Sequence, residues 1–476
     1  MHSGFSRLQA ELKALDQRAA ALGGALDEGG NVRFSRPTKV DDARLAQIKA
    51  VESEAKALLA EADRLDDRAG RVLAQGEGEP AAAMKLEAAP AGSSSLPEPP
   101  TNGTPTDNAA WWNGLSPAQQ QDVIASHPDW IGNRDGVSAV ARDAANRALE
   151  PGYRTALQAQ AAQLQQEISG SFLGGAFALG KKNQLNGVQQ KLRDLDAVDQ
   201  TLKDHPNALL MLLDTTSSSK QALAAVAIGD PDTADHISAT TIGVGATLES
   251  SLAPRANAAQ SLQDDTEAIL QKAGQGQDGV ATIAWLGYET PQWADVPSYA
   301  TDALAHGGAG KLANFYEGLS AAWSPADGDA RDAPQITAFG HSYGSLTTAF
   351  AMEQLPKGVV SDVMFYGSPG IELTNSDSAG SLNVAAGHVY DEHAADDPIG
   401  VVPGLLPVYG PDPAALSWVT RLATTAGTGP GDGEEHDADH GHSDYYATGA
   451  NGYLTMGGYN MAAIASGHPE LAVKGP

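Results

Sequence analysis

The spacing of apolar residues over the first 76 positions predicts two amphipathic helices. In each stretch, apolar side chains recur at alternating steps of three and four residues, which places them on one stripe of a helix. The first stripe contains Phe5, Leu8, Leu12, Leu15, Ala19, Leu22 and Leu26, and the second contains Ile48, Val51, Ala55, Leu58, Ala62, Leu65, Ala69 and Val72. Gly29-Gly30 and Pro37 interrupt the pattern between them. Because neither stripe can be buried alone, we predict that residues 1–76 form an antiparallel helical hairpin.

The helical spacing of apolar residues stops after residue 76 and resumes at residue 110. Residues 77–109 are rich in Gly, Pro, Ser, Ala and Glu and have no periodicity, which predicts a flexible linker. Residues 110–205 regain helical spacing: Ser116-Pro117 marks a helix start, and two further apolar stripes follow. These stripes consist of Leu157, Ala161, Leu164 and Ile168, and of Leu185, Val188, Leu192, Leu195 and Leu202. We expect this helical region to pack on the part of the chain that follows.

From residue 206 onward, short apolar runs alternate with helical stretches. This alternation is typical of a mostly parallel sheet that is covered by helices on both faces. The predicted strands are 208–213, 222–228, 237–242, 280–286, 335–339, 362–366 and 388–391, and the clearest helices are 254–273, 299–322 and 344–355. We therefore predict an α/β domain over residues 206–476, preceded by all-helical N-terminal regions.

The turn Gly340-His341-Ser342-Tyr343-Gly344 is the strongest candidate for chemistry. In a Gly-x-Ser-x-Gly elbow, a sharp strand-to-helix turn forces the serine into a strained conformation that bulky neighbours would obstruct. The chain has 52 glycines, so the five-residue pattern alone carries little weight. The predicted strand 335–339 before it and the predicted helix 344–355 after it supply the required context. Ser342 is therefore the predicted nucleophile of an α/β-hydrolase fold.

A serine nucleophile needs a histidine that accepts its proton and a carboxylate that orients the histidine. In this fold the chain order is Ser, acid, His. Asp397 follows the last predicted strand and is our candidate acid, with its neighbour Asp396 as the alternative. The histidines that follow are His436, His440, His442 and His468. His442 has the most suitable position, before a helical run at 458–465, whereas His468 lies in the tail beside Pro469.

The oxyanion that forms during acyl transfer needs two backbone N–H donors. One is expected to be the amide of Tyr343, the residue after the nucleophile. The second normally comes from a loop after an earlier strand. Ile242-Gly243-Val244-Gly245 follows the predicted strand 237–242, and Val244 is our candidate donor there.

The composition of the chain excludes several classes of binding partner and metal site. The chain has 30 Lys and Arg against 59 Asp and Glu, and a net charge of −29 repels nucleic acid. The absence of cysteine excludes disulfides and cysteine-ligated metal centres. The acidic and histidine-containing segment 434–440 lies among glycines and is interpreted as a solvated loop, so we predict no metal and no cofactor. A signal sequence and an integral membrane segment are also not expected, which predicts a cytoplasmic protein or one exported without a cleaved signal peptide.

Several motifs together resemble one known family. They include Trp111-Trp112-Asn113-Gly114-Leu115-Ser116, Ile131-Gly132-Asn133-Arg134-Asp135-Gly136, Gly229-Asp230-Pro231, Trp285-Leu286-Gly287-Tyr288, the Ser342 elbow, Asp397-Pro398-Ile399 and His442-Ser443-Asp444-Tyr445. The chain resembles an α/β-hydrolase group, still labelled a domain of unknown function, that occurs in bacterial proteins with helical N-terminal regions. The resemblance implies a Ser342–Asp397–His442 triad, and the His-Ser-x-Tyr tail favours His442. The family usually has Pro-Gly-Thr-Gly where this chain has Ile242-Gly243-Val244-Gly245.

These observations predict a serine hydrolase that cleaves a carboxylic ester of a small molecule or lipid, in the manner of a carboxylesterase or lipase. The alternative is a non-catalytic binding protein, or a protein associated with type VII secretion, in which the helical hairpin acts and the hydrolase scaffold is degenerate. The hairpin of residues 1–76 resembles the small helical hairpins exported by that route without a signal peptide. Residues 1–76 are expected to bind a helical partner or a second copy of the chain.

Overall fold

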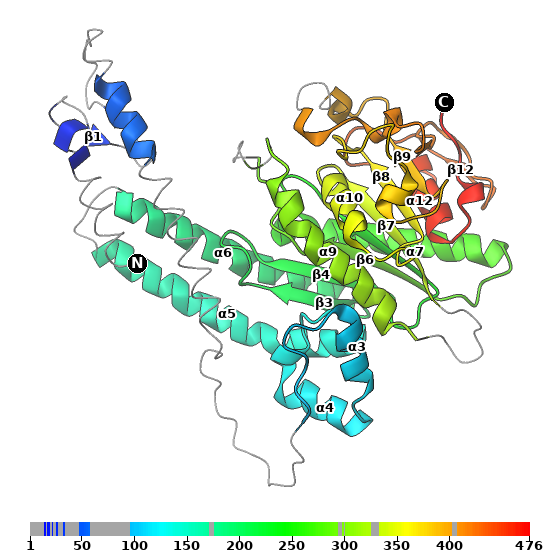
Figure 1. Cartoon of the computed structure of the whole chain (residues 1–476), viewed down its shortest axis with the longest axis horizontal. Helices are drawn as coiled ribbons and strands as arrows, with labels where there is room; N and C mark the ends of the chain where they lie inside the picture. The colour runs from blue at the N-terminus through cyan, green and yellow to red at the C-terminus, as the bar shows by residue number, and fades with distance from the viewer. Residues whose placement is uncertain are drawn as a thin grey trace. The chain divides into compact units, whose positions relative to one another are not determined.

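The computed structural model describes residues 96–170, 176–293, 298, 300–324, 333–401 and 407–476, and shorter segments between positions 14 and 57 (Figure 1). The chain divides into two compact units. One unit consists of Met1–Ser94 and Gln158–Gln189, and the other of Ser95–Leu157 and Gln190–Pro476. The second unit contains every residue of the candidate site.

In the first unit, the described N-terminal residues are helical at 47–57 and at several positions from 14 to 21. Between them, strand β1 (Ala25–Leu26) pairs antiparallel with β2 (Val32–Arg33). The buried apolar residues here belong to the two predicted stripes and are Leu15, Ala19, Ile48, Val51 and Ala55. Most of the predicted hairpin 1–76, and of the predicted linker up to residue 95, lies outside the described residues. Both therefore stay predictions.

The helical region before the sheet begins with α3 (Pro105–Asn113) and α4 (Pro117–Ser126). Thr104 and Ser116 cap these helices with reciprocal capping boxes, and a proline occupies the first turn of each. For this reason α3 begins at Pro105, before the predicted end of the linker at residue 109. Trp112 lies in a small apolar core beneath these helices, and the Thr106 Oγ1 hydroxyl of α3 donates to Glu317 Oε1 at 3.0 Å.

The two long apolar stripes belong to α5 (Ala139–Gly170) and α6 (Ala176–Asp204), with the 3₁₀ helix η1 (Pro128–Trp130) before them. The C-terminal part of α6 meets α7 (Leu248–Lys272), where Arg193 Nε pairs with Glu249 Oε2 at 2.9 Å. Of the helices that the structure describes, none combines the length and apolar composition needed to span a membrane.

An eight-stranded sheet forms the centre of the second unit, in the order β10-β9-β8-β7-β5-β6-β4-β3. Its strands are β3 (Leu209–Asp214), β4 (Leu223–Ile228), β5 (His236–Thr241), β6 (Val280–Leu286), β7 (Gln335–His341), β8 (Asp362–Tyr366), β9 (Val389–Glu392) and β10 (Thr420–Arg421). Strand β4 is antiparallel to both β3 and β6, and all other pairs are parallel. The mostly parallel sheet is therefore confirmed.

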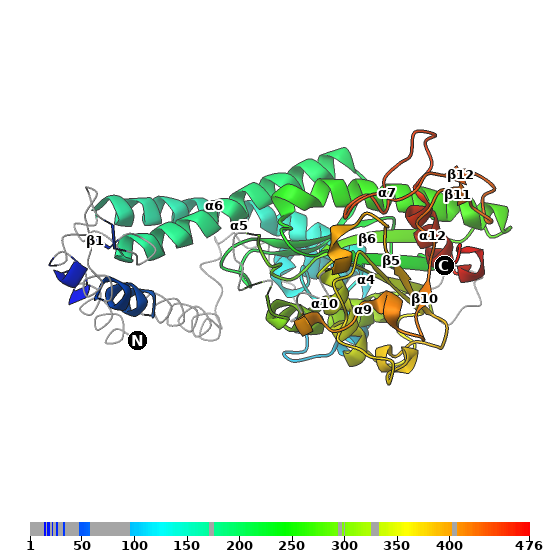
Figure 2. The same ribbon diagram turned by 90° about the horizontal axis from the view of Figure 1, so that it is seen from above.

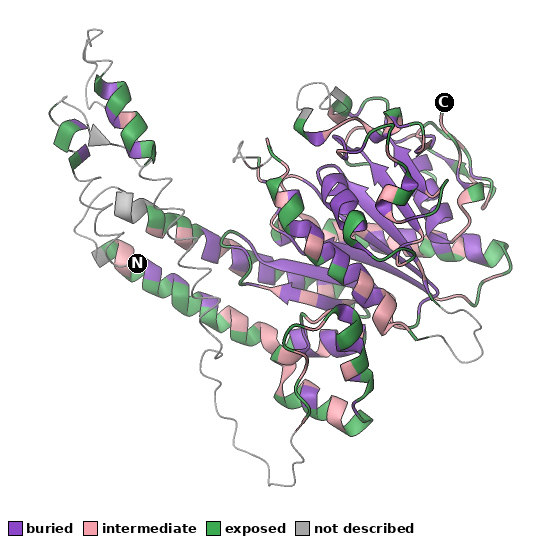
Figure 3. Ribbon diagram, viewed as in Figure 1, coloured by how far each residue is buried: buried purple, intermediate pink, exposed green. Residues whose placement is uncertain are grey.

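Helices cover both faces of this sheet (Figure 2). Helices α9 (Ala303–Ala322) and α10 (Gly344–Gln354) lie on one face, whereas α7 and α12 (Met456–Ala465) lie on the other. Side chains of β7 belong to the apolar cores on both faces of the sheet. Ile336 packs on the face of α9 and α10, and Phe339 packs on the face of α7 and α12. The strands are buried almost throughout (Figure 3). This is the α/β-hydrolase fold that the sequence predicts.

The remaining elements are short and lie mostly in the C-terminal third. They are η2 (Ala379–Leu382), η3 (Pro398–Val401), η4 (Pro407–Tyr409), η5 (Pro413–Ala415), β11 (Gly427–Thr428), β12 (Glu435–His436) and η6 (Pro469–Leu471). The loops after β9 and β12 carry the candidate acid and histidine, so loops at one edge of the sheet complete the site.

Candidate active site

Ser342 follows β7 directly and has φ +56°, a left-handed conformation that non-glycine residues rarely adopt. The flanking glycines are required by close backbone contacts. A Cβ at Gly344 would lie 2.4 Å from Thr241 O, and one at Gly340 would lie 2.9 Å from Ser345 Cα. These positions tolerate no side chain, so the Gly-x-Ser-x-Gly spacing has a direct steric cause in this fold.

The structure brings Ser342, His442 and Asp397 into one line. His442 Nε2 lies 2.9 Å from Ser342 Oγ, and His442 Nδ1 lies 2.9 Å from Asp397 Oδ2. Asp397 follows β9, and His442 comes from the loop after β12. Ser342 is 5% exposed and Asp397 is 7% exposed, so both groups are held away from bulk water.

Asp397 is surrounded by hydrogen-bond donors. In addition to His442, the Ile399 amide donates to its Oδ1 at 2.8 Å and the Tyr445 hydroxyl to its Oδ2 at 2.7 Å. Burial raises the pKa of Asp397, but the hydrogen bonds from His442, Ile399 and Tyr445 outweigh burial and lower the pKa overall. The carboxylate is therefore ionised and able to orient a histidine at neutral pH.

Tyr445 is a site residue whose role the sequence did not predict. Its ring is 1% exposed, and its hydroxyl donates to Asp397 while accepting from the Ala394 amide at 3.0 Å. It thus ties the loop that carries Asp397 to the loop that carries His442. The His442-Ser443-Asp444-Tyr445 motif did contain this residue, but only as a mark of family resemblance.

His341, the residue before the candidate nucleophile, contacts the backbone of His442. Its Nε2 lies 2.8 Å from the backbone oxygen of His442, and its ring stacks on Tyr366 with centroids 4.8 Å apart. Burial lowers the pKa of His341 well below its ordinary value, and the positive charge of Arg255 lowers it further. The ring is therefore neutral, with Nε2–H as the donor to His442.

The other candidates from the sequence form contacts elsewhere. Asp396 is exposed, accepts from the Gly441 amide at 2.8 Å and lies 3.2 Å from His440 Nδ1. His436 Nε2 is 2.9 Å from Asp432 Oδ2, and its Nδ1 is 2.7 Å from a backbone oxygen. His468 lies beside Glu470 in the tail. The structure therefore brings Asp397 and His442 to Ser342, and not these alternatives.

The loop after β5 lies against the elbow. A Cβ at Gly243 would lie 2.7 Å from the Tyr343 amide nitrogen and 3.0 Å from Ser342 Oγ. The Tyr288 hydroxyl donates to Ile242 O at 2.6 Å and fixes the start of this loop. The loop thus has the position that an oxyanion loop requires. The donor roles of Tyr343 and Val244 stay predictions.

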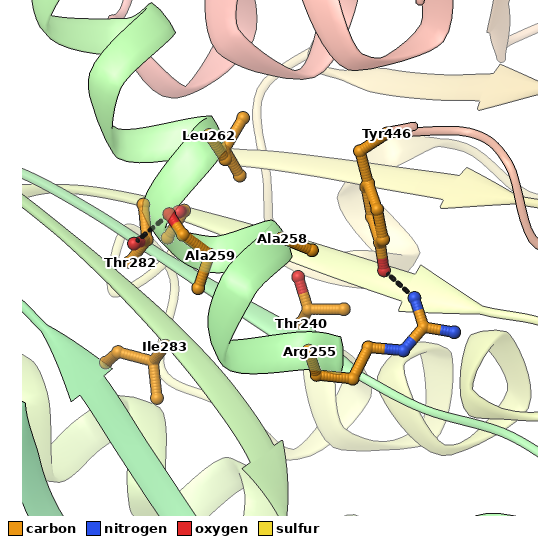
Figure 4. Close-up of a pocket in the computed structure, with 9 residues that line it drawn as sticks. Thr240, Arg255, Ala258, Ala259, Leu262, Thr282, Ile283 and Tyr446 are labelled. Atoms are coloured by element: carbon orange, nitrogen blue, oxygen red, sulfur yellow. Dashed lines mark hydrogen bonds between the residues drawn. The ribbon is translucent and has the colours of Figure 1, made fainter. Parts of the chain in front are cut away.

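Two cavities of the second unit are lined by residues other than Ser342, His442 and Asp397. One, of about 10 Å³, is lined by Thr240, Arg255 and Tyr446 among others, and has room for about one water molecule (Figure 4). Arg255 Nη1 donates there to the Tyr446 hydroxyl, which lies 2.6 Å from the Tyr366 hydroxyl. The other cavity, of about 310 Å³, lies near Trp130 and Arg134.

One cluster has the composition of a metal site. Asp302, His306 and Glu372 offer ligand atoms within 4.8 Å of one another, and His306 Nε2 lies 3.2 Å from Asp302 Oδ2. No sequence pattern indicates this group, because its members come from two separate loops and a helix. It lies outside the acidic and histidine-containing segment 434–440.

The comparisons with known proteins agree with this fold. Residues 217–407 match the family model described as alpha/beta hydrolase. An uncharacterized protein of Mycobacterium bovis is 36% identical over 252 residues, which cover 52% of this chain and 90% of that protein. An uncharacterized protein of Mycobacterium tuberculosis is 30% identical over 404 residues, covering 78% of this chain and 57% of that protein. The fold and the family model define an α/β hydrolase. The chain belongs to this alpha/beta hydrolase family, together with these mycobacterial proteins.

Similarity to solved structures is weaker. The crystal structure of 2,6-dihydroxy-pseudo-oxynicotine hydrolase has a TM-score of 0.28 and 11% identity, and the alignment covers 77% of this chain and 95% of that one. A TM-score this low supports no inference about the substrate. The predicted resemblance to an α/β-hydrolase family without assigned function is confirmed by the family model, and the resemblance of residues 1–76 to secreted hairpins stays a prediction.

Proposed function

We propose that the chain is a serine hydrolase that cleaves a carboxylic ester through a Ser342–His442–Asp397 triad. The observation that carries the proposal is the continuous line from Ser342 Oγ through both nitrogens of His442 to Asp397, with 2.9 Å at each hydrogen bond. These distances are those required of a nucleophile, its base and the group that orients the base. The left-handed φ of Ser342 adds the strained conformation expected of an elbow nucleophile.

The proposed reaction follows from this geometry. Asp397 accepts the Nδ1–H of His442, which leaves the Nε2 lone pair facing Ser342 Oγ. His442 takes the serine proton as Oγ attacks the ester carbonyl, and the amides of Tyr343 and Val244 stabilise the oxyanion. His442 then protonates the leaving alcohol, and an acyl-Ser342 ester remains. Water attacks this ester with His442 as base, releasing the acid and restoring the serine.

Two features bear on the substrate. The net charge of −29 disfavours polyanionic esters. The Trp293 indole is 65% exposed and lies against Gly245, where a Cβ would be 2.3 Å from its Nε1. An exposed aromatic side chain beside the proposed oxyanion loop favours a substrate with an apolar part. We therefore propose an ester of a small molecule or lipid.

A fluorophosphonate probe tests the proposal, because it labels serines that are activated by a general base. Ser342→Ala is expected to abolish labelling, and His442→Ala and Asp397→Asn to slow it by about a hundredfold or more. Asp396→Asn is the matched control, because it removes the neighbouring, exposed carboxylate and should label at the normal rate.

Turnover of short-chain nitrophenyl esters should follow the same order among these variants. Labelling that persists in His442→Ala, or equal loss in Asp396→Asn and Asp397→Asn, would contradict the triad. A protein that remains unlabelled while folded would favour the non-catalytic alternative, in which residues 1–76 act as a binding element.

A further inference from the structure

Two fully buried carboxyl groups lie between the loops that carry Asp397 and His442. Glu392 is the last residue of β9 and is 0% exposed, and Asp439, in the loop leading to His442, is 3% exposed. Both side chains converge on the first turn of α12. A Cβ at Gly457 would lie 2.8 Å from Glu392 Oε2, 2.9 Å from Asp439 Oδ1 and 2.8 Å from Asp439 Oδ2.

Each carboxyl group has one oxygen that is paired and one that is not. Asn460 Nδ2 donates to Glu392 Oε1 at 2.9 Å, and the Gly457 amide donates to Asp439 Oδ2 at 2.9 Å. Glu392 Oε2 and Asp439 Oδ1 are buried and have no hydrogen-bond partner in the part of the chain that the structure describes. A buried acceptor without a donor is costly, and one proton on either oxygen would supply the missing donor.

The surroundings make two negative charges here unfavourable. Among the described residues, no Lys or Arg forms an ion pair with either group. Asp391 on the same strand is a further buried carboxyl, and Tyr366 and Tyr445 face Glu392 from β8 and from the His442 loop.

The groups around Asp439 are His440, Asp444 and the Thr455 hydroxyl. Burial raises the pKa of Glu392 well above its ordinary value, and burial raises the pKa of Asp439 to about 7. Two close carboxyl groups of this kind normally hold one proton between them.

We propose that Glu392 and Asp439 share one proton and act as positioning residues that hold the His442 loop against the end of β9, from which the Asp397 loop departs. The shared proton forms a hydrogen bond from one carboxyl group to the other across the two loops. Asp439 ionises first, with a pKa of about 7, and the negative charge of Asp439 helps to raise the pKa of Glu392, so one proton remains on the pair above this pH. When this last proton leaves at more alkaline pH, two buried negative charges repel each other. The catalytic part of this inference rests on the proposed function, whereas the shared proton itself does not.

The first test is the pH dependence of thermal unfolding in the full chain. A raised folded-state pKa gives stability that is fully present below the unfolded-state pKa and is lost as the pH rises through the folded-state pKa. The unfolding midpoint of the natural chain should therefore fall by several degrees between about pH 5 and about pH 9. Glu392→Gln carries a permanent N–H donor toward Asp439 and should remove most of this fall.

Controls isolate the pair from the other acids. Asp437→Asn removes an exposed charge from the same loop and should keep the fall of the natural chain. Asp439→Asn supplies the donor from the opposite side, and serves if Glu392→Gln does not fold. An equal pH dependence in the natural chain and in the amide variant would overturn the proposal. The proposal would also be overturned if added Ca²⁺ raised the unfolding midpoint at about pH 9 in the natural chain but not in Glu392→Gln. A cation, and not a proton, would then lie between the two carboxyl groups.

The second test measures fluorophosphonate labelling against pH. The labelling rate of the natural chain should decline at alkaline pH as the shared proton is lost, and Glu392→Gln should keep a higher rate there. The two tests separate the proposals. Unfolding that depends on the pair in a chain that never labels would remove the hydrolase proposal and leave the shared proton. Normal labelling with no difference in pH dependence between the natural chain and Glu392→Gln would support the hydrolase proposal and remove the shared proton.

Discussion

Replacing Tyr445 by phenylalanine tests whether this tyrosine positions the proposed triad. The change removes only the hydroxyl, which donates to Asp397 at 2.7 Å and accepts from the Ala394 amide at 3.0 Å. The first bond is charge-assisted and is worth about 1.5–3 kcal/mol, and the buried amide left without a partner costs about 1–3 kcal/mol. The free energy of unfolding should therefore fall by roughly 3 kcal/mol near neutral pH.

The same change should act on the ionisation of Asp397. Its pKa is lowered in the folded state, so its ionised form contributes stability above the unfolded-state pKa, and this contribution is lost as the pH falls through the folded-state pKa. Without the Tyr445 hydroxyl, the pKa of Asp397 should rise toward its ordinary value. The acid limb of kcat/KM for ester hydrolysis should move to higher pH, and kcat should fall about tenfold with little change in KM.

Urea unfolding and the pH profile of ester turnover together show whether Tyr445 positions the proposed triad or only stabilises the fold. Tyr453→Phe is the control, because Tyr453 lies in the same region and is 37% exposed. If Tyr445→Phe loses stability but keeps the natural pH profile and kcat, Tyr445 supports only the fold. If it loses neither, the hydrogen bond to Asp397 contributes nothing measurable, and the reasoning is refuted.

Two further substitutions test the elbow. Gly243→Ala places a Cβ 2.7 Å from the Tyr343 amide, so labelling of Ser342 should fall by about a hundredfold. Gly307→Ala is the control, because a Cβ there has no atom within 4 Å, and this variant should label normally. Equal labelling of the two variants would contradict the prediction. Ser342→Gly removes the strain of φ +56° and should raise the unfolding free energy by about 1 kcal/mol relative to Ser342→Ala, although neither is active. An equal free energy for both would mean that the elbow stores no strain.

Much of the second unit was predictable from local pattern. The seven predicted strands occur within about two residues of their observed ends, because buried strands are short apolar runs between turn residues. β10 was missed, since Thr420–Arg421 is two residues long and has no apolar pattern. The direction of β4 was also undetermined, because an apolar run looks the same whether its neighbours are parallel or antiparallel.

The proposed triad was predictable for a different reason. Ser342, Asp397 and His442 were selected by the elbow, by chain order and by a family motif, and the structure places them within hydrogen-bond distance. Their catalytic roles stay proposals. The same reasoning kept Asp396 and His436 open, because chain order alone does not distinguish neighbouring residues on one loop.

The sequence by itself determined the type and order of the seven predicted strands and of the main helices in residues 206–476, and the position of the strained turn at Ser342. Both depend on residues close together in the chain, where periodicity and glycine spacing are visible. Only the tertiary structure decided that His341 donates to His442, 101 positions away, and that Glu392 and Asp439 both approach Gly457. Such contacts arise where separate loops converge at the edge of a sheet. No local pattern encodes them, because each partner taken alone has the appearance of an ordinary polar residue.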